Sequence, residues 1–505
     1  MNEALGFVSV GAEGGWQKRQ RSAAHSIDCD NGRMSDRAND VTDRISEPDA
    51  SVDGIAAELR EAVVSGLTRP RAFREQQLDG LIGMLLQHAS RWEGALRADL
   101  GKSEIEAHLT EIGFVVSEAR AAKRSLRRWM APQRSLAPLA LQPASVRTVS
   151  EPLGAALIIA PWNYPLHLAL APLVGAITAG CAAVVKPSEL APATSRLLAE
   201  LAPHHLDPRS VRVVEGGVPE TTALLEERWD LIFYTGNGTV ARVVAAAAAK
   251  HLTPTVLELG GKSPAYVHRS ADIPAAARRI AWAKWLNAGQ TCVAPDHIRV
   301  DREVAGELVE ELRRTTAEQL GDPRTSPDYG RIVSDRHLER LRGLLASGTA
   351  VAGGDVDAAD RYVAPTILTD VDDASAVMQE EIFGPILPVL PVDGVDGFIA
   401  SMRGADKPLA LYVFARDADA VRRVERETSS GSMGVNVAVA HVGAASLPFG
   451  GVGESGTGAY HGKHSFEAFS HRKPVLSKPT GIDTLRVIYP PFSDWRGRLA
   501  KRILR

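Results

Sequence analysis

The sequence predicts an α/β fold built from two doubly wound parallel sheets. In the middle of the chain, short apolar runs alternate with stretches of helical periodicity, which is typical of parallel strands joined by helices. A second series of the same kind follows Gly260, and the length of 505 residues is consistent with roughly three domains. The contents of 45% hydrophobic and 24% charged residues are those of a soluble globular protein.

The first series opens with helices. Residues 55–130 have helical periodicity, in which Leu78, Leu81 and Leu85 recur on one face. The buried strands that follow are expected at residues 155–160, 182–185, 211–214 and 231–234. The helices between them are expected at residues 166–179, 193–201 and 221–227.

The second series has the same character. Its expected helices are residues 273–286, 304–319 and 335–346, and its expected strands include residues 297–300, 386–389 and 409–415. Within the first series, residues 131–150 lie between the helical residues 55–130 and the strand expected from residue 155. They have the composition of a linker with an extended arm.

The two ends of the chain differ from this pattern. Residues 1–53 are rich in polar residues and glycine without apolar periodicity, so we expect disorder there. They have no signal-peptide pattern, and Met34 is a candidate for the true start, a hypothesis that N-terminal sequencing of the native protein tests. Residues 477–505 form a basic tail.

Charge and cysteine content narrow the class of protein. A formal net charge of −3 implies no nucleic-acid partner. The three cysteines Cys29, Cys181 and Cys292 are too few and odd in number for a disulfide framework, which favours a reducing compartment and hence the cytoplasm. We expect no metal site.

One uncharged stretch resembles a membrane span in length. Residues 152–185 contain no Asp, Glu, Lys or Arg. Pro161, Pro165 and Pro172 interrupt the stretch. We therefore interpret it as a buried strand, a loop and a buried helix.

Two segments carry a candidate nucleophile and a candidate base. Cys292 lies in Gly-Gln-Thr-Cys and Glu258 in Glu-Leu-Gly-Gly, where glycines let the backbone approach a ligand closely. A cysteine beside a base is a recurrent arrangement in covalent catalysis. The ordinary alternatives are a buried inert thiol for Cys292 and a buried carboxylate with a partner for Glu258.

Polar residues also follow the expected strands. Asn163 lies where the first strand ends, an edge at which ligands bind in open α/β sheets and where its amide can donate to an oxyanion. Lys186 and Glu189 follow the second strand and can bind ribose hydroxyls. A turn residue and an ordinary solvated loop are the respective alternatives.

Two further segments favour a dinucleotide. The turn from Gly236 to Gly238 precedes a helix, whose free backbone N–H groups suit a pyrophosphate, although the Gly-x-Gly-x-x-Gly fingerprint is absent. Glu381 and Phe383 are two residues apart, so in an extended chain both side chains face the same side and can contact a sugar and a flat ring. An amphipathic loop is the alternative for the second segment.

Together these segments resemble the aldehyde dehydrogenase superfamily in order and spacing, and the resemblance covers about residues 55–490. The chain also resembles the class 3 branch of this superfamily, which includes fatty, aromatic and coniferyl aldehyde dehydrogenases and is commonly dimeric. The motifs that carry the branch resemblance are Asp-Leu-Gly-Lys-Ser at 99–103, Trp-Asn-Tyr-Pro at 162–165, Leu-Pro-Phe-Gly-Gly-Val-Gly at 447–453, Tyr-His-Gly-Lys at 460–463 and Phe-Ser-His at 469–471.

The resemblance implies a division into domains. It implies a dinucleotide-binding domain from residues 54–130 and 151–255, and a catalytic domain from residues 256–440. Residues 131–150 and 441–476 then form bridging and oligomerisation segments that include a small β arm.

The resemblance also implies site residues. Cys292 resembles the nucleophile, Glu258 the general base, and Asn163 with the Cys292 backbone N–H the oxyanion hole. The residues that resemble cofactor contacts are Trp162, Lys186, Glu189, Gly236, Asn237, Gly238, Val240, Glu381 and Phe383. The chain departs from the family at Ala241, where a glycine is usual.

The implied activity is NAD(P)-dependent oxidation of an aldehyde, medium- or long-chain aliphatic or aromatic, to the carboxylic acid. The Glu189 carboxylate would repel a 2′-phosphate, so we expect NAD with NADP also accepted. A CoA-acylating aldehyde dehydrogenase, a cysteine esterase without redox chemistry and a catalytically silent binding protein remain as alternatives.

The implied assembly is a homodimer. The tail from Trp495 to Arg505 is basic and partly amphipathic, so contact with an anionic membrane surface is a second expectation beside a cytoplasmic location. A solvated or dimer-packed end is the alternative.

Overall fold

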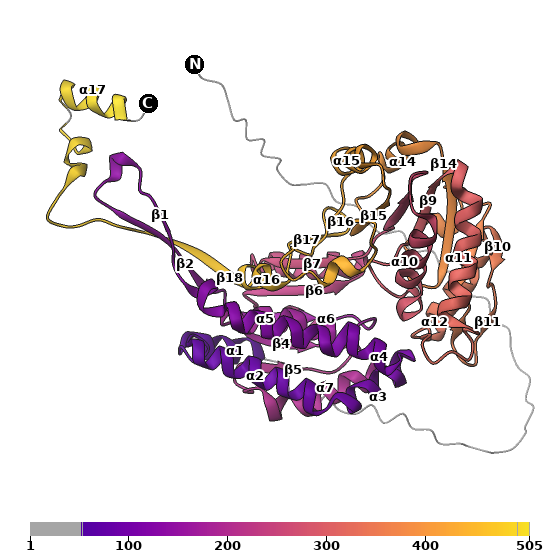
Figure 1. Cartoon of the computed structure of the whole chain (residues 1–505). Coiled ribbons are helices and arrows are strands. Elements are labelled where there is room, and N and C mark those ends of the chain that lie inside the picture. The colour runs from indigo at the N-terminus through magenta and orange to yellow at the C-terminus, as the bar shows by residue number, and fades with distance from the viewer. Residues whose placement is uncertain (1–51, 53, 492, 504–505) are drawn as a thin grey trace, which may run out of the picture. The chain divides into compact units, whose positions relative to one another are not determined.

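A computed structural model of the chain describes residues 52, 54–491 and 493–503 (Figure 1). The expectations for residues 1–53, disorder and a start at Met34, lie outside the described residues except for Val52.

A six-stranded sheet forms the first half of the fold. Its order is β17-β7-β6-β3-β4-β5, and all neighbours are parallel except β17, which runs antiparallel to β7. The strands are β3 (Ala155–Ile159), β4 (Ala182–Lys186), β5 (Val211–Val213), β6 (Leu231–Gly236), β7 (Thr255–Leu259) and β17 (Gly456–Thr457).

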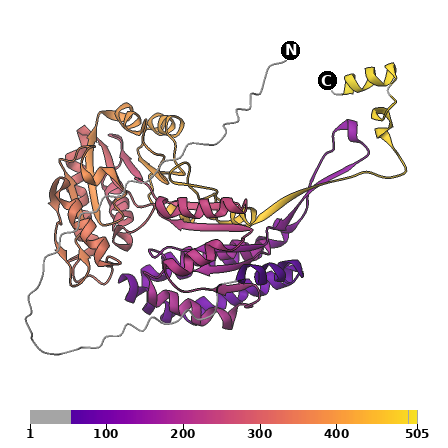
Figure 2. The same ribbon diagram turned by 180° about the vertical axis from the view of Figure 1, so that it is seen from behind.

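Helices cover both faces of this sheet, as Figures 1 and 2 show. In β3, Ala156 and Ile158 belong to one core cluster, whereas Ala155 and Leu157 belong to another, as alternation along a strand requires. The helices are α1 (Ile55–Val64), α2 (Arg71–Gln87), α3 (Ala89–Leu100), α4 (Glu104–Ala107), the π-helix η1 (His108–Ile112), α5 (Gly113–Met130), α6 (His167–Ala179), α7 (Pro192–His205), α8 (Val218–Glu226) and α9 (Gly238–Lys250).

A seven-stranded sheet forms the second half, in the order β10-β13-β14-β9-β8-β15-β16. Only β10 is antiparallel to its neighbour. The strands are β8 (Pro264–Val267), β9 (His297–Asp301), β10 (Thr349–Ala352), β13 (Thr366–Thr369), β14 (Ile386–Val392), β15 (Ala410–Phe414) and β16 (Ser432–Val435), and a separate hairpin holds β11 (Val356–Asp357) and β12 (Tyr362–Val363).

Helices also accompany this second sheet, and Figure 1 shows α10 and α11 beside β9 and β14. The helical elements are α10 (Ile273–Trp285), η3 (Leu286–Gly289), η4 (Arg302–Val304), α11 (Ala305–Leu320), α12 (Asp335–Leu344), η5 (Leu345–Ser347), α13 (Ala376–Gln379), α14 (Gly394–Met402), α15 (Ala418–Glu427) and η6 (Ala440–Gly443). The predicted fold class, α/β with two doubly wound sheets, is confirmed.

A three-stranded antiparallel arm extends from the six-stranded sheet in both ribbon views. Its order is β1-β2-β18. The arm and the segments next to it are β1 (Gln133–Ser135), η2 (Leu139–Leu141), β2 (Ser145–Pro152), α16 (Gly462–Ala468), β18 (Ser470–Ser477), η7 (Thr484–Ile488) and α17 (Asp494–Ile503).

Most expected elements agree with the structure to within a few residues, but one helix end is wrong. The helix expected to end at residue 201 continues to His205, with Pro203 inside its last turn. Proline lacks only its own N–H there, and the turn still closes because the Leu206 N–H bonds to the Ala202 carbonyl at 2.8 Å.

The uncharged stretch of residues 152–185 folds as β3, a loop, α6 and β4, as expected. None of the helices in the described part of the chain combines the length and hydrophobicity that spanning a bilayer requires.

Candidate active site

Cys292 follows a strained turn between α10 and β9. Asn287, Ala288 and Gly289 all have left-handed backbone angles, with φ of 52°, 50° and 73°. A left-handed residue that is not glycine costs roughly 1–2 kcal/mol, so the surroundings must enforce this turn.

Two buried amide side chains enforce it. The Asn287 side chain donates to the carbonyls of Asn163 at 2.7 Å and Gln290 at 3.2 Å. The Gln290 side chain donates to the carbonyls of Asn287 and Arg331, each at 3.0 Å, and accepts from the Val333 N–H at 3.0 Å. These contacts fix the strained turn and thereby the position of Cys292.

Asn163 lies in the loop between β3 and α6 and is 2% exposed. Its amide nitrogen donates one hydrogen bond to the Gln290 carbonyl at 3.0 Å. Because a carboxamide carries two N–H donors, the second one is available to a ligand. The structure therefore brings Asn163 to the loop that carries Cys292.

A buried lysine holds Asn163 from the other side. Lys102 donates to the Asn163 carbonyl at 3.1 Å and pairs with Glu111 at 2.5 Å. Glu111 lies in η1, and its second oxygen accepts the backbone N–H groups of Leu166 at 2.9 Å and His167 at 3.0 Å. π-Helical turns are frequent at functional sites, and this one supplies the anchor of the Asn163 loop.

Glu258 lies inside β7, opposite Gly456 of β17, and is 2% exposed. Neither carboxylate oxygen has a hydrogen-bond partner in the described structure, and burial raises its pKa well above the usual range. A buried carboxyl group without a partner is costly, which favours a functional role.

The Cys292 thiol is half-buried and free. Burial, followed by the nearby carboxyl groups of Glu381 and Glu258, raises its pKa, whereas the backbone N–H groups of residues 292 and 293 act in the opposite direction. The Glu381 carboxyl group packs against Gly260, two residues after Glu258, so the two carboxyl groups come from neighbouring segments. Both act electrostatically on the Cys292 thiol.

Glu381 and Phe383 lie in the loop between α13 and β14. The Glu381 carboxyl group packs against Gly260, where an added Cβ would lie 1.9 Å from a carboxylate oxygen. The Phe383 ring packs edge-on against Trp162, with ring centroids 5.3 Å apart. Phe383 has a left-handed φ of 48°, so the expected extended chain is wrong.

Lys186 and Glu189 lie together at the end of β4. The Lys186 side chain is buried and donates to the Glu189 carboxylate at 2.9 Å, while the Glu189 side chain is 47% exposed. Partial burial is the largest single influence and works to raise the pKa of Glu189, but the hydrogen bond from Lys186, the Glu189 backbone N–H and the Lys186 charge together lower it. Glu189 also approaches Gly217, just before α8.

The Gly236–Gly238 turn leads into α9. The Asn237 side chain accepts the Val240 N–H at 2.9 Å and so begins the helix. The other N–H groups of the first turn have no partner within the helix, which suits an anion such as a pyrophosphate. The Ala241 methyl group lies in the core cluster under α9, 2% exposed, so its departure from glycine affects helix-to-sheet packing.

The sequence reasoning did not identify Lys102, Glu111, Asn287 and Gln290 as site residues. Lys102 is part of the Asp-Leu-Gly-Lys-Ser motif at 99–103, and Gln290 is part of the Gly-Gln-Thr-Cys segment, but neither was assigned a role. A buried Lys102–Glu111 pair has no signal in sequence, because the two residues are nine positions apart and separated by α4 and the start of η1. No three His, Cys, Asp or Glu side chains lie together as a metal site would require within the described residues.

A family model for the aldehyde dehydrogenase family matches residues 46–475. Among curated proteins, the chain is 47% identical to mouse aldehyde dehydrogenase family 3 member A2, over 88% of this chain and 93% of that protein. It is 46% identical to the dog protein named "aldehyde dehydrogenase, dimeric NADP-preferring", over 88% and 98%.

Solved structures agree with this result. Staphylococcus aureus AldH in a substrate-bound state is 40% identical, with a TM-score of 0.88 over 90% of this chain and all of that one. An indole-3-acetaldehyde dehydrogenase complexed with NAD+ is 26% identical, with a TM-score of 0.77 over 84% and 88%. The predicted family and enzyme class are confirmed: the chain belongs to the aldehyde dehydrogenase family, and it is an NAD(P)-dependent aldehyde oxidoreductase.

Proposed function

We propose that the protein oxidises an aldehyde to the carboxylic acid through a thioester on Cys292, which water activated by Glu258 then hydrolyses. The observation that carries this proposal is that three segments join around the Cys292 turn. The Asn163 amide bonds the Gln290 carbonyl two residues before Cys292, the Glu381 carboxyl packs against Gly260 two residues after Glu258, and both carboxyl groups act electrostatically on the thiol. Each group comes from a different segment, and each has the chemistry that one step needs.

The first step is addition of the Cys292 thiolate to the aldehyde carbon, which forms a carbon–sulfur bond and places negative charge on the former carbonyl oxygen. The free N–H of the Asn163 amide and the Cys292 backbone N–H stabilise that oxygen. Fixed donors of this kind act strongly because they need no reorganisation as the charge develops. The contacts of Lys102 and Asn287 to the Asn163 carbonyl support this fixed position.

The second step breaks the carbon–hydrogen bond and leaves a thioester. NAD(P), when bound, supplies the hydride acceptor for this step. Glu381 and Phe383 fit the sugar and the flat ring of such a cofactor, because the Glu381 carboxyl packs against Gly260, two residues after Glu258, and the Phe383 ring packs against Trp162, the neighbour of Asn163.

The third step hydrolyses the thioester. Glu258 takes a proton from water as the oxygen attacks the carbonyl carbon, and the carbon–sulfur bond breaks to release the acid and the thiol. Because burial raises the pKa of Glu258 well above its usual range, the ionised fraction grows with pH, and turnover is expected to rise with pH up to that pKa.

The test follows reduction of NAD or NADP at 340 nm with a panel of aliphatic and aromatic aldehydes. Cys292→Ala is expected to abolish turnover, whereas Cys181→Ala is the matched control, because that thiol is buried and burial raises its pKa to about 11. Turnover that persists in Cys292→Ala would contradict the covalent mechanism.

Two alternatives within the same assay are separable. A CoA-acylating enzyme would form acyl-CoA when coenzyme A is added, and an esterase would cleave esters without any change at 340 nm. The Glu258 side chain beside the thiol favours water as the acceptor, since hydrolysis needs a base there.

For the substrate we propose a medium- or long-chain aliphatic or an aromatic aldehyde, with NAD as cofactor and NADP also accepted. The ionised Glu189 beside Lys186 favours NAD. The name of the dog relative, NADP-preferring, favours acceptance of NADP. The same aldehyde panel, run with each cofactor separately, decides both points.

We propose a homodimer and contact of the C-terminal segment with an anionic membrane surface. The word dimeric in the dog relative's name and the arm of β1, β2 and β18 favour the dimer, which light scattering tests.

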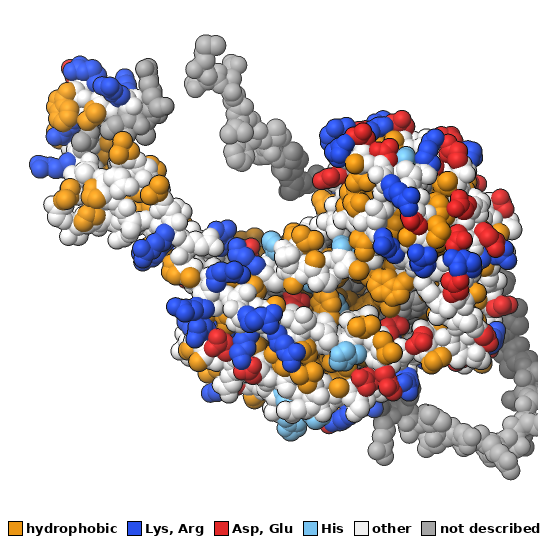
Figure 3. Space-filling view, viewed as in Figure 1, with side chains coloured by type: hydrophobic (Ala, Val, Ile, Leu, Met, Phe, Trp, Pro, Cys, Tyr) orange, Lys and Arg blue, Asp and Glu red, His pale blue; other side chains and the backbone are white. Residues whose placement is uncertain are grey.

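The proposed membrane contact rests on the segment beyond the arm. In Figure 3, apolar and basic side chains gather on this segment, at upper left, and Trp495 and Ile488 are exposed. Pelleting with anionic liposomes, with and without residues 492–505, tests the contact. The cytoplasmic location stays a prediction.

A further inference from the structure

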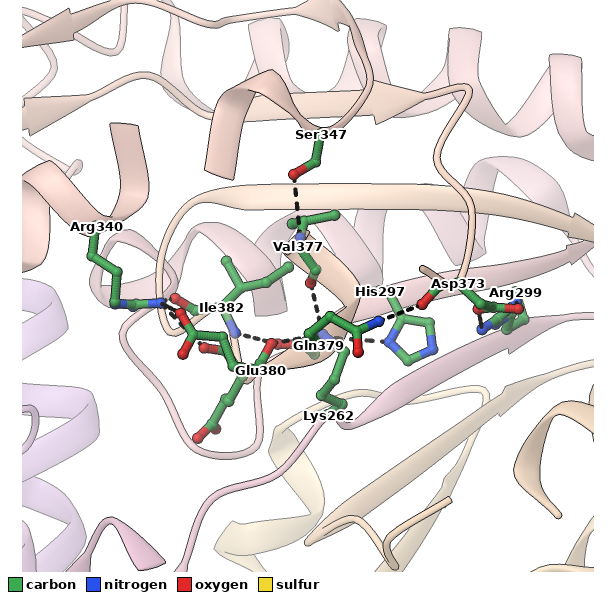
Figure 4. Close-up of polar contacts among 12 residues, drawn as sticks. Lys262, His297, Arg299, Arg340, Ser347, Asp373, Val377, Gln379, Glu380 and Ile382 are labelled. Atoms are coloured by element: carbon green, nitrogen blue, oxygen red, sulfur yellow. Dashed lines mark hydrogen bonds and ion pairs between the residues drawn. The ribbon is translucent and has the colours of Figure 1, made fainter. Parts of the chain in front are cut away.

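The segment from Asp373 to Ile382 contains Glu381 and ends just before Phe383. It is irregular apart from the single turn of α13. Figure 4 shows how side chains from surrounding elements fasten it. Arg299 of β9 pairs with Asp373, the Ser347 hydroxyl accepts the Val377 N–H at 3.2 Å, and Gln379 donates to the Asp373 carbonyl at 2.6 Å. Irregular backbone that is partly buried needs such partners.

Lys262 adds two bonds to this segment and one to Asp296. Its ammonium group donates to the Asp296 carboxylate at 2.5 Å and to the carbonyls of Val377 and Glu380, each at 2.9 Å. A lysine has three N–H donors, and here all three are used. The side chain is only 21% exposed, so the bonds are largely shielded from water.

Asp296 completes the clamp. One oxygen accepts from Lys262, and the other accepts the Ile382 N–H at 2.8 Å. Lys262 follows Glu258 by four residues, and Asp296 follows Cys292 by four residues. The pair therefore joins the chain segment of the base, the chain segment of the nucleophile and the loop that carries Glu381.

We propose that Lys262 is a positioning residue, which sets Glu381 and Phe383 relative to Glu258 and Cys292 and thereby determines cofactor affinity. The inference rests on the proposed function, in which Glu381 and Phe383 contact the cofactor. Arg340 also bonds the Glu381 and Ile382 carbonyls, at 3.3 and 2.5 Å, but it comes from α12 and is not joined to the strand of Glu258. Lys262 alone among these anchors links the loop to that strand.

The pH dependence of NADH binding distinguishes a positioning role of Lys262 from a general loss of stability. Burial, then Asp296, raises the pKa of Glu381 to about 8, whereas Lys262 and Arg340 lower it. The other charged or titratable groups near Glu381 are Lys284, whose own pKa burial lowers to about 8, and the Cys292 thiol. Because a carboxylate accepts ribose hydroxyls better than a carboxylic acid does, NADH affinity should rise as the pH rises through this region.

The experiment measures NADH binding by fluorescence on the full chain, from pH 6.5 to 9. Lys262→Met should weaken NADH binding at least tenfold and move the midpoint of its pH dependence upward, while the KM for aldehyde changes less than threefold. Glu381→Gln identifies which part of the pH dependence belongs to Glu381 rather than to Lys284. Arg423→Met, which removes a surface pair with Asp396, is the matched control.

A double variant guards against misfolding. Lys262→Met with Asp296→Asn removes both charges, so thermal stability should recover relative to Lys262→Met, but NADH binding should stay weak because the loop carbonyls still lack their donor. Wild-type NADH affinity in a folded Lys262→Met or double variant would overturn the proposal. Failure of the wild-type protein itself to bind NADH would instead overturn the proposed function.

Discussion

The two ends of the proposed site are built in opposite ways. At the thiol end, Glu258 and Asn163 are each 2% exposed, and Asn163 is bonded to Gln290, Asn287 and Lys102. At the other end, Glu189 is half-exposed, and Lys186 is its one side-chain partner in the described structure. A substitution at the buried thiol end is therefore expected to disturb several neighbouring residues. At the end that carries Glu189, which we call the open end, water screens the charges and limits the effect of a substitution.

The largest effect is expected from Glu258→Gln. The amide keeps the shape of the buried side chain but cannot take a proton from water, so steady-state turnover should fall about 10²–10⁴-fold, the typical contribution of a general base. The first turnover of NAD reduction should remain, because thioester formation precedes hydrolysis.

Stopped-flow absorbance at 340 nm distinguishes these phases. A burst of about one NADH per site followed by a slow steady state is the expected trace. If the burst is lost together with turnover, Glu258 acts before the thioester forms, and its assignment to hydrolysis is wrong.

The second prediction concerns a residue that acts only through others. Asn287→Ala removes the amide that bonds the Asn163 and Gln290 carbonyls and keeps a Cβ at a φ of 52°. Loss of such buried bonds corresponds to about 1–3 kcal/mol, so kcat should fall roughly 10–100-fold. The KM for NAD should change little, because the open end is untouched.

Asn287→Gly is the matched control, since glycine tolerates the left-handed angle. It should recover thermal stability compared with Asn287→Ala but retain the low kcat. If Asn287→Gly has wild-type kcat, backbone strain rather than the amide explains the effect.

This contrast also explains what the sequence could predict. Glu258, Cys292 and Asn163 were candidates because glycines and strand ends mark them locally, and Glu381 because it stands two residues from Phe383. The family resemblance then assigned their roles, and the alternation of patterns predicted the sheets. Asn287 and Lys102 carry no such mark, because their importance arises from backbone angles and from partners far away in sequence. Phe383 shows the same limit, since an extended chain was expected where the backbone is left-handed.

The third prediction compares a buried carboxyl group with the half-exposed one at the open end. Glu118 is buried on α5 beside His461, and its carboxyl accepts the Gly462 N–H at 3.0 Å. Burial raises its pKa to about 7, whereas the pKa of Glu189 is lowered. A raised carboxyl pKa stabilises the folded state fully below about pH 4.5, and this contribution is lost as the pH rises through 7.

Glu118→Gln stays neutral, so relative to the wild type its melting temperature should rise between pH 5 and 8. A difference of about 2.5 pH units sets an upper limit of roughly 3 kcal/mol. Glu310→Gln, on the exposed face of α11, is the control and should show no such trend. A pH-independent difference for Glu118→Gln would contradict the assignment.

The smallest effect is expected at the open end, from Glu189→Gln. The change removes a negative charge that repels a 2′-phosphate and releases the buried Lys186 to attract it, so the KM for NADP should fall about 3–10-fold, within the range of a partly exposed charge. The KM for NAD should rise slightly, because an amide is a weaker acceptor for ribose hydroxyls. Glu226→Gln, which removes an exposed partner of Lys250, is the control.

Raising the salt concentration to about 0.5 M should shrink the NADP effect of Glu189→Gln, since exposed charges are screened, while the effect of Asn287→Ala should persist. A salt-independent gain for NADP would mean that shape rather than charge selects the cofactor, and the contrast between the two ends would then not be electrostatic.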